Sequence, residues 1–559
     1  MSSIVRHRPF DEALRGLRRL SSLRPEMTVE RLAFLVAAFF TVFCNGAFFR
    51  AVAATGTLHG PKGWLTALSL VLMVGALNML LLCLLLNRWT FRPVLTVLLP
   101  VTALAAHFMS QYTVYLDPDM LRNILHTDGK ESGELLSLGM LPSLLALGVV
   151  PTLLVWRVRL RPRSMGRGVL VRLSCIVLSL LVACGAMMVS FQDLSALMRN
   201  HKEVRHLITP GNYLVSLVRV LQHDGARRHE PKAPIGVNAR VVGRGPSAKP
   251  RLVVLVVGET VRAQNWGLNG YARQTTPQLR AIGPINFTDV TSCGSATEVS
   301  VPCMFSPYGR AHYDKDRIEH SQSLLNVLDH AGIATLWRDN QTGCKGVCEG
   351  LPFQSFEHAR DPAACTAEGC LDEVMLHGLS EEVARRPGDM VVVLHQLGSH
   401  GPSYAHRYPA RLRRFTPTCE TADLGDCTRD EIVNAYDNSV LYTDDFLART
   451  IRFLAEQSAR DTALIYVSDH GESLGENGLY LHGVPYAIAP DTQTHVPMVM
   501  WLSPGMAAER DIDIACMKRE SHEPVSQDNL FHSVLGLMQV RTPEYDATLD
   551  LFDRCTPHG

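Results

Sequence analysis

The stretches RLVVLVVGE (251–259), DMVVVLHQ (389–396) and TALIYVSDH (462–470) decide the fold of the second half of the chain. Each is a nearly continuous apolar run, which is typical of strands buried on both faces of a parallel sheet. Segments with helical patterning lie between such strands, among them SLLNVLDHAG (323–332) and EIVNAYDNSVLYTDDFLARTIRFLAEQ (431–457). The alternation predicts an α/β domain with a mainly parallel central sheet sandwiched by helices.

Residues that can bind a metal follow these three strands. Ligands of open α/β sheets bind beyond the carboxyl ends of the strands, so polar residues found there are the first candidates for a site. These candidates are Glu259, His395, His400, Asp469, His470 and His482. A single acidic residue after a strand is usually explained by helix capping. Oxygen and imidazole ligands without thiolates, however, suit a catalytic zinc site with an exchangeable position.

The candidate nucleophile is Thr297, in the segment TSCGSATEVSVPCMFS (291–306). Thr297 opens an expected helix, so its hydroxyl could simply cap the helix, and Glu298 would favour that end electrostatically. A helix N-terminus is also a site for anions, and a disulfide between Cys293 and Cys303 would hold Thr297 rigidly. A threonine hydroxyl bound to zinc there could lose its proton and attack phosphorus.

Five apolar runs, each near the roughly 20 residues that a membrane-spanning helix needs, occupy the first part of the chain. They cover about 32–54, 64–86, 93–116, 139–156 and 169–191. Buried core helices are the alternative, but five such runs in succession favour membrane spans. Ala51-Val52-Ala53 resembles a signal-peptide cleavage site. The leader and the apolar run are nevertheless longer than in a signal peptide, so we interpret the first run as a retained anchor.

Arginine placement predicts the orientation of the spans. Arginines are frequent in the leader, in the second loop with Arg88 and Arg92, and in the fourth loop. The third loop is acidic and holds Asp117, Asp119, Asp128, Glu131 and Glu134. This alternation places the leader in the cytoplasm, and an odd number of spans then places the large C-terminal half outside.

The chain has 54 basic and 54 acidic side chains, so a nucleic-acid partner is not expected.

Cysteine usage is an independent indication of compartment. Four of the 14 cysteines, Cys44, Cys83, Cys175 and Cys184, lie inside apolar runs. The other ten are Cys293, Cys303, Cys344, Cys348, Cys365, Cys370, Cys419, Cys427, Cys516 and Cys555. An even number of cysteines on the predicted outer side fits disulfides in an oxidising compartment. A zinc cluster of thiolates is the alternative, but most spacings suit disulfides between neighbours; sequence cannot fix the pairing.

The chain divides into four parts: a cytoplasmic segment 1–31, a transmembrane domain of five helices 32–191, a connector 192–240 and a catalytic domain 241–559. In the connector, apolar residues recur at helical spacing, namely Leu214, Leu217, Val218 and Leu221. This predicts an amphipathic helix on a membrane or partner surface, or one packed against the soluble domain. The composition of the following stretch, RRHEPKAPIG (227–236), predicts a linker.

At these residues the chain resembles the membrane-anchored phosphoethanolamine transferases, especially those that modify lipid A and confer polymyxin resistance. The resemblance covers nearly the whole chain. It rests on the combination of VVGET (256–260), SCGSATEVSVPCMF (292–305), WRDNQTGCKGVC (337–348), LHQLGSHGP (394–402) and SDHGES (468–473) followed by LHG (481–483). The resemblance implies that the catalytic domain has the alkaline phosphatase/sulfatase fold.

The resemblance also implies roles for individual residues. The zinc ligands would be Glu259, Thr297, Asp469 and His470, with Thr297 as the nucleophile. His400 and His482 would surround the phosphoryl group, with His395 close by, and Lys345 would belong to the substrate pocket. Family members often carry asparagine where this chain has Gln341, which affects headgroup contact rather than the zinc chemistry.

The implied enzyme is a multi-pass protein of the bacterial inner membrane with a periplasmic catalytic domain. Its donor would be phosphatidylethanolamine, its acceptor a phosphate of lipid A, and its intermediate a phosphoethanolamine-threonine that forms as diacylglycerol leaves. Three alternatives stay open: a transferase acting on lipopolysaccharide core or a periplasmic glycan, a membrane-tethered zinc phosphodiesterase or sulfatase, and a lipid-binding module without activity. The sequence leaves any protein partner unknown.

Overall fold

The computed structural model describes residues 24–58, 63–126, 137–227, 231–243, 248–366 and 369–557. The chain forms two compact units. We call them the helical unit, Met1–Leu121 and Leu138–Gln222, and the sheet unit, Arg122–Ser137 and His223–Gly559. Some residues used to predict orientation lie outside the described residues, namely 1–23 of the leader and Asp128, Glu131 and Glu134.

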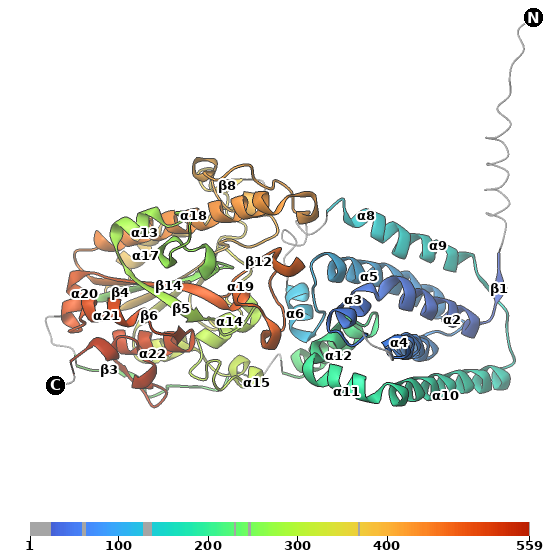
Figure 1. Ribbon diagram of the computed structural model, residues 1–559. Helices are drawn as coiled ribbons and strands as arrows, with labels where there is room; N and C mark the ends of the chain where they lie inside the picture. Colours follow the sequence, from blue (N-terminus) through green and yellow to red (C-terminus); the bar gives the residue numbers. More distant parts are fainter. Residues whose placement is uncertain are drawn as a thin grey trace, which may run out of the picture. The chain divides into compact units, whose positions relative to one another are not determined.

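All five predicted apolar runs are helical over most of their length (Figure 1), and the third, predicted as 93–116, ends as a helix at Gln111. The elements are α2 (Val29–Phe39), η1 (Phe40–Cys44), α3 (Gly46–Ala54), α4 (Gly63–Leu85), α5 (Phe91–Gln111), α8 (Met140–Ser143), η2 (Leu144–Val149), α9 (Val150–Arg157) and α10 (Met165–Val189). Four described helices are long and apolar enough to cross a membrane, and a fifth span is added if the bent pair Val29–Cys44 and Gly46–Ala54 counts as one. The prediction of an apolar helical domain is confirmed.

The first of these runs bends by 49°. The bend follows the π-helical segment η1 and is located at Asn45, where the regular backbone hydrogen bonding is interrupted. The buried Asn45 side chain replaces the missing partners. Its amide donates to Phe40 O and to Thr209 O, and its carbonyl accepts from Thr209 N, each at 2.9 Å.

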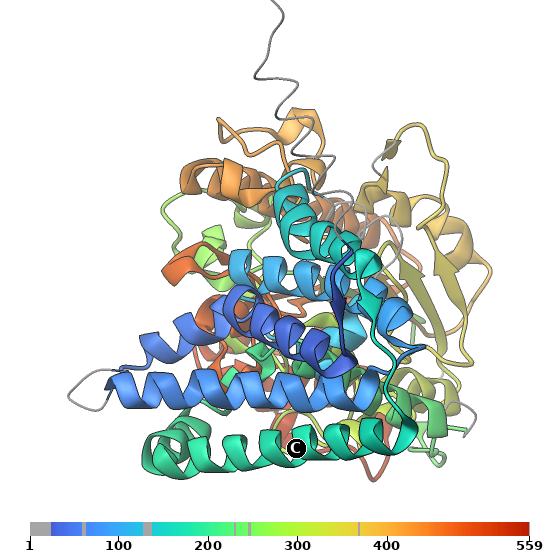
Figure 2. The same cartoon turned by 90° about the vertical axis from the view of Figure 1, so that its right-hand side faces the viewer.

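Large apolar side chains cover the outside of the helical unit. Leu84 of α4 and Leu170 and Leu181 of α10 are 65%, 66% and 65% exposed. The helices that carry them, α4 and α10, lie side by side (Figure 2). A surface of this kind is expected for a protein that faces lipid rather than water.

Shorter elements precede, separate or follow the spans. They are β1 (Glu26–Met27), β2 (Arg159–Leu160), α6 (Pro118–His126), α11 (Phe191–Asn200), η3 (Lys202–Leu207) and α12 (Gly211–Arg227). Helix α12 contains the predicted amphipathic residues. Val218 and Leu221 are 52% and 60% exposed, while Tyr213 and Val220 of the same helix are buried. An exposed apolar face is what a helix lying at a membrane surface requires.

The sheet unit is built on eight strands in the order β15-β5-β14-β11-β4-β10-β6-β7. They are β4 (Arg251–Gly258), β5 (Ile285–Thr291), β6 (Ala334–Asp339), β7 (Phe353–Ser355), β10 (Met390–His395), β11 (Asp461–Ser468), β14 (His495–Leu502) and β15 (Val525–Ser526). Strand β14 is antiparallel to both neighbours, and the other neighbouring pairs are parallel. Every residue of β4, β10 and β11 is buried, as their apolar sequences predict.

Helices cover both faces of this sheet (Figure 1). One face carries α13 (Pro277–Ile282), α17 (Leu379–Ala384) and α18 (Arg429–Ala455); the other carries α14 (Thr297–Met304), α16 (Leu324–His330), α21 (Ile514–Glu520) and α22 (Asp528–Leu537). On the second face, Val253, Leu255 and Val257 of β4 pack in one core with Val301 of α14 and Phe531 of α22. The predicted α/β architecture with a mainly parallel sheet is confirmed.

The smaller elements of the sheet unit lie outside this framework. They are β3 (Arg240–Val241), α15 (Lys315–Glu319), β8 (Cys365–Thr366), β9 (Gly369–Cys370), β12 (Ser473–Leu474), β13 (Tyr480–Leu481), α19 (Asp491–Thr494), α20 (Pro504–Glu509) and β16 (Val540–Arg541). Strands β3 and β16 pair with each other, as do β8 with β9 and β12 with β13.

The ten predicted disulfide cysteines pair in sequence order. The pairs are Cys293–Cys303, Cys344–Cys348, Cys365–Cys370, Cys419–Cys427 and Cys516–Cys555. The disulfide prediction is therefore confirmed, including the distant last pair. The four remaining cysteines, all in the helical unit, are free thiols.

The buried central strands make a stability prediction. Val393 of β10 is fully buried, so Val393→Ala removes two methyl groups from a closed core and should cost about 2 to 3 kcal/mol. The thermal unfolding midpoint of the detergent-solubilised chain should fall by about 5 °C. The control Val237→Ala truncates a valine that is 68% exposed and should leave the midpoint nearly unchanged. Equal shifts in both variants would contradict the assigned core.

Candidate active site

Four side chains meet at the carboxyl edge of the central strands. Glu259 follows β4, Asp469 and His470 follow β11, and Thr297 is the first residue of α14. The sheet register brings the strand ends level, since Ser468 pairs with Gly258. Glu259, Asp469 and His470 are fully buried and Thr297 is 6% exposed. The metal-binding atoms of Glu259, Asp469 and His470 lie within 4.8 Å of one another.

The Thr297 hydroxyl lies within this group. It donates a hydrogen bond to Glu259 Oε2 at 3.1 Å and lies 3.3 Å from His470 Nε2. His470 Nε2 is also 3.4 Å from both Glu259 Oε1 and Asp469 Oδ2. The other ring nitrogen, Nδ1, donates to Gly471 O at 2.9 Å. That bond leaves Nε2 as the nitrogen that faces the carboxylates and the hydroxyl.

Two carboxylate oxygens of this group, Glu259 Oε1 and Asp469 Oδ2, are buried without a hydrogen-bond donor among the described residues. Leaving a buried polar atom unsatisfied costs about 1 to 3 kcal/mol, and more for a charged group. A divalent cation between the two oxygens would remove this cost. Two carboxylates, an imidazole nitrogen and a hydroxyl are suitable ligands, so the residues fit a metal ion.

Protonation equilibria show the same excess of negative charge. Burial and the charge of Glu259 raise the pKa of Asp469 to about 7. Burial alone would lower the pKa of His470, but Asp469 and Glu259 raise it to about 10. Protons therefore supply the positive charge in the metal-free site at neutral pH. Metal binding should release them, as in other sites whose ligands must be deprotonated.

The backbone around Glu259 is tightly held. Thr260 has φ 55°, in the left-handed region that residues other than glycine rarely adopt. Its N–H donates to Asp469 Oδ1 at 3.2 Å, and its carbonyl accepts from the Tyr436 hydroxyl at 2.7 Å. On the other side, a Cβ at Gly398 would lie only 2.7 Å from Glu259 O, so only glycine fits there. These contacts fix the position from which the Glu259 side chain extends.

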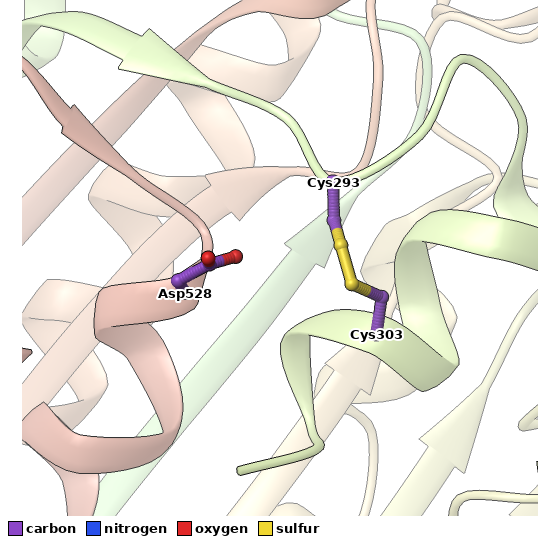
Figure 3. A group of neighbouring side chains, drawn as sticks. All are labelled: Cys293, Cys303 and Asp528. Carbon is purple, nitrogen blue, oxygen red and sulfur yellow. A yellow bond between two sulfur atoms is a disulfide. The ribbon is translucent and has the colours of Figure 1, made fainter. Parts of the chain in front are cut away.

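Helix α14 begins at Thr297, and its N-cap residue is Ala296. The alternative that Thr297 is the N-cap residue is therefore wrong, and its hydroxyl is directed at Glu259 and His470 instead. The Cys293–Cys303 disulfide ties α14 to the preceding loop, beside Asp528 of α22 (Figure 3). Because both sulfurs are in the disulfide, this group offers no thiolate for a metal. The disulfide braces the helix end that carries Thr297.

The two flanking histidines lie beside the Thr297 group. The ring centroids of His470 and His482 are 4.4 Å apart, and those of His482 and His400 are 5.2 Å apart. His482 Nδ1 donates to Glu472 Oε2 at 2.8 Å, and the Tyr404 hydroxyl donates to Glu472 Oε1 at 2.6 Å. Burial, together with the charge of His470, lowers the pKa of His482. The structure thus brings His400 and His482 beside His470.

His395 lies at the end of β10, behind the ligands. Its Nδ1 donates to Asp339 Oδ1 at 2.7 Å, and both side chains are fully buried. Burial opposes protonation, but Asp339, Glu259 and Asp469 raise the pKa of His395. Its Nε2 has no hydrogen-bond partner within the described part of the chain. His395 is therefore a buried histidine in the field of the site, rather than an ordinary loop residue.

Gln341 and Lys345 come from one loop after β6. The Gln341 amide donates to Glu259 Oε2 at 2.7 Å, so this side chain supports a candidate ligand directly. Lys345 Nζ lies 2.9 Å from Glu298 Oε1 and donates to Thr342 Oγ1 at 2.6 Å. Glu298 follows Thr297 in α14, so the Lys345 ammonium is paired with the residue next to the candidate nucleophile.

Three supporting residues were missed by the sequence analysis: Asp339, Tyr404 and Glu472. Asp339 is the last residue of β6 in the WRDN segment, and Glu472 lies four residues beyond β11 in the SDHGES segment. Acidic residues so close to strand ends could have been identified from the sequence. Tyr404 gives no comparable signal, because its role depends on how a loop folds back to Glu472.

Comparison with protein families matches both halves of the chain. Residues 73–224 match the family described as phosphoethanolamine transferase EptA/EptB, and residues 251–540 match the sulfatase family. The chain is 38% identical over 539 residues to phosphoethanolamine transferase EptA of Escherichia coli strain K12, covering 95% of this chain and 98% of that protein. The chain belongs to the phosphoethanolamine transferase family.

Further relatives agree with this membership. The transferase is 39% identical over 477 residues to phosphatidylethanolamine transferase Mcr-1 of Escherichia coli, covering 83% of this chain and 88% of that protein. It also matches the solved structure of the integral membrane lipooligosaccharide phosphoethanolamine transferase A from Neisseria meningitidis, with a TM-score of 0.91 and 37% identity over 95% of this chain and 100% of that one. The expected family, fold class and transferase activity are confirmed.

The Gln341 contact makes a prediction about metal affinity. Gln341→Ala removes the donor that orients Glu259, and loss of such a supporting partner typically weakens metal binding about 10- to 100-fold. Competition with a chromogenic chelator would measure the change for a divalent ion. Gln264→Ala removes an exposed glutamine whose amide donates to Asp491 O instead and serves as the control. Unchanged affinity in Gln341→Ala would show that Glu259 is oriented without it.

Proposed function

We propose that this transferase moves phosphoethanolamine from phosphatidylethanolamine to a phosphate of lipid A, with Thr297 as its covalent carrier. The observation that carries the proposal is the position of the Thr297 hydroxyl, 3.1 Å from Glu259 Oε2 and 3.3 Å from His470 Nε2. The substrates named for the relatives, phosphatidylethanolamine for Mcr-1 and lipooligosaccharide for the neisserial enzyme, support the choice of donor and acceptor.

Zinc is the proposed metal, held by Glu259, Thr297, Asp469 and His470. A set of carboxylate, hydroxyl and imidazole ligands without thiolates suits catalytic zinc. When bound, zinc would lower the pKa of the Thr297 hydroxyl and neutralise charge on the transferred phosphoryl group. Glu259 Oε1 and Asp469 Oδ2 are buried and have no hydrogen-bond donor in the part of the chain that the structure describes, which supports the presence of a cation at this point.

In the first half-reaction, Thr297 Oγ1 attacks the phosphorus of phosphatidylethanolamine. Its proton leaves along the hydrogen bond to Glu259 Oε2. The bond between phosphorus and the diacylglycerol oxygen breaks, and that oxygen takes a proton from His400 or His482. The products are diacylglycerol and a phosphoethanolamine ester of Thr297. Lys345 pairs with Glu298, the residue after the nucleophile, and its positive charge stabilises the extra negative charge of the transition state.

In the second half-reaction, a phosphate oxygen of lipid A attacks the phosphorus of the phosphoethanolamine-threonine. The bond from phosphorus to Thr297 Oγ1 breaks, and Oγ1 takes back a proton. Two displacements through a covalent intermediate predict ping-pong kinetics. The acceptor phosphate gains a zwitterionic substituent and loses part of its negative charge. A less negative surface attracts cationic peptides such as polymyxin more weakly.

The proposed location is the bacterial inner membrane, with the N-terminus in the cytoplasm and the catalytic domain in the periplasm. The arginine-rich second and fourth loops support this orientation, as do five disulfides that need an oxidising compartment. Both lipid substrates are embedded in membrane. A domain tethered there meets their headgroups at a high effective concentration.

Replacement of the nucleophile tests the covalent mechanism. Thr297→Ala should abolish the phosphoethanolamine adduct on the protein and lower diacylglycerol release at least about 10³-fold, because no other hydroxyl lies in the ligand group. Intact-protein mass spectrometry would detect the adduct, and mass analysis of lipid A from expressing cells would detect the product.

Thr297→Ser and Thr288→Ala are the matched variants. The serine keeps a hydroxyl and should keep measurable transfer, and Thr288 lies in β5 outside the site. Transfer by Thr297→Ala at the normal rate would refute a covalent role for Thr297. Unmodified lipid A from cells with an otherwise active enzyme would refute the proposed acceptor.

Zinc removal tests the metal. Dialysis against dipicolinate should abolish diacylglycerol release, and zinc sulfate should restore it, because the carboxylates then regain their counter-charge. Asp469→Asn should carry much less zinc per chain by elemental analysis. Asp528→Asn, which alters the carboxylate beside the Cys293–Cys303 disulfide, should retain its zinc. Full activity after complete zinc removal would contradict the proposed cofactor.

A further inference from the structure

The chain that enters the sheet unit is anchored close to the catalytic loops. Within Pro231–Gly236, Ala233 N donates to His320 O at 2.7 Å, and Gln322 N donates to Ala233 O at 2.9 Å. Ile235 N donates to the Gln322 side-chain oxygen at 3.2 Å. These residues belong to the stretch that the sequence predicts as a linker, and here they form a fixed edge of the sheet unit.

Lys232 extends from this edge toward the loop between β6 and β7. Its ammonium donates to Gly346 O at 2.6 Å, and its side chain is 18% exposed. Gly346 has φ 83°, and a Cβ there would lie 3.1 Å from Lys232 Nζ. Glycine therefore provides both the backbone conformation and the space that the ammonium needs. Glu349 Oε2, at 3.8 Å, is a more distant partner.

The residue before Gly346 is Lys345, whose own backbone is strained. Lys345 has φ 50°, a left-handed conformation that costs a non-glycine residue of the order of 1 kcal/mol or more. It persists only where the surroundings impose it. The Lys345 ammonium meets Glu298 Oε1 at 2.9 Å, one residue from Thr297. The backbone conformation of Lys345 and Gly346 therefore sets where this ammonium lies.

The Gly346 carbonyl belongs to the peptide group between Gly346 and Val347, and the Val347 N–H of that group donates to Cys344 O at 2.9 Å. The Cys344–Cys348 disulfide closes the loop at its ends, and Lys232 Nζ bonds the carbonyl on the other side of the same peptide group. A pocket of about 410 Å³ lies at this point, lined by Lys232, Glu298, Lys345 and Gly346 among others. Without the Lys232 ammonium, the bond from Val347 N–H would hold this peptide group on one side, and water in the pocket would replace the ammonium at the carbonyl.

We propose that Lys232 is a positioning residue for the transfer reaction: by holding the Gly346 carbonyl, it keeps the Lys345 ammonium against Glu298 beside the nucleophile. A charge-assisted hydrogen bond from a largely buried ammonium is strong enough for this purpose. The inference rests on the proposed function, because it assigns Lys345 a part in the reaction at Thr297.

Lys232→Met in the full-length, zinc-loaded enzyme tests the inference. The single-turnover rate of diacylglycerol release should fall about tenfold, since small misplacements of reacting groups cost rate, while the KM for phosphatidylethanolamine and the zinc content stay within about twofold. Lys232→Arg should recover most of the rate. Lys518→Met removes another lysine, on α21, that donates to a backbone carbonyl, Gly283 O at 2.8 Å, and this variant should leave the rate unchanged.

A double-mutant cycle separates positioning from general stability. In a Lys345→Met background, adding Lys232→Met should lower the rate by no more than about twofold further, because the group it positions is gone. An additional tenfold loss in that background, or a rate within twofold of wild type for Lys232→Met alone, would overturn the inference. If Lys232→Met does not fold, Lys232→Gln takes its place with the same criteria. A phosphoethanolamine-threonine still detected in these variants would leave the covalent mechanism intact.

Discussion

Burial of negative charge at one point of the sheet is the constraint on which the rest of the catalytic unit depends. The side chains of Glu259 and Asp469 are fully buried, next to each other and to His470. Each residue directly follows a buried central strand, so neither side chain can move out to solvent. Like charges in such a place favour whatever restores neutrality, either protons or a cation. The fold thus creates a site with affinity for protons or a cation. The Thr297 hydroxyl lies beside this site, where a bound cation would act on it.

The surroundings of the site are rigid for separate physical reasons. Parallel strands in register align the candidate ligands. The close approach of Gly398 leaves no room for the backbone of Glu259 to shift. The left-handed conformation of Thr260 is imposed by its bonds to Asp469 and Tyr436. Strain concentrated next to a ligand is common where a site is preorganised, and stabilisation from the large core compensates for it.

Sequence patterns predicted the framework because they report burial and chain direction. Continuous apolar strands specified the parallel sheet, and residues after those strands specified the ligand group. What the patterns missed depends on contacts between distant segments. The bend at Asn45 needs the backbone of Thr209, the orientation of His482 needs Glu472 and Tyr404, and the anchoring of Lys232 needs Gly346. No periodicity encodes such pairs. Thr297 was ambiguous in sequence because a capping residue and a nucleophile occupy nearly the same position.

Four of the five disulfides join cysteines no more than 10 residues apart, and the fifth spans 39. Short closed loops restrict the unfolded chain only modestly, so these crosslinks contribute less to global stability than long-range ones would. Their effect is local: each of the four short crosslinks closes one segment as soon as its two cysteines have crossed the membrane. Two of these segments carry residues of the site, Thr297 between Cys293 and Cys303 and Lys345 between Cys344 and Cys348. The segments closed by Cys365–Cys370 and Cys419–Cys427 carry none of the ligand group, so substitutions there can accumulate while the ligand group stays the same.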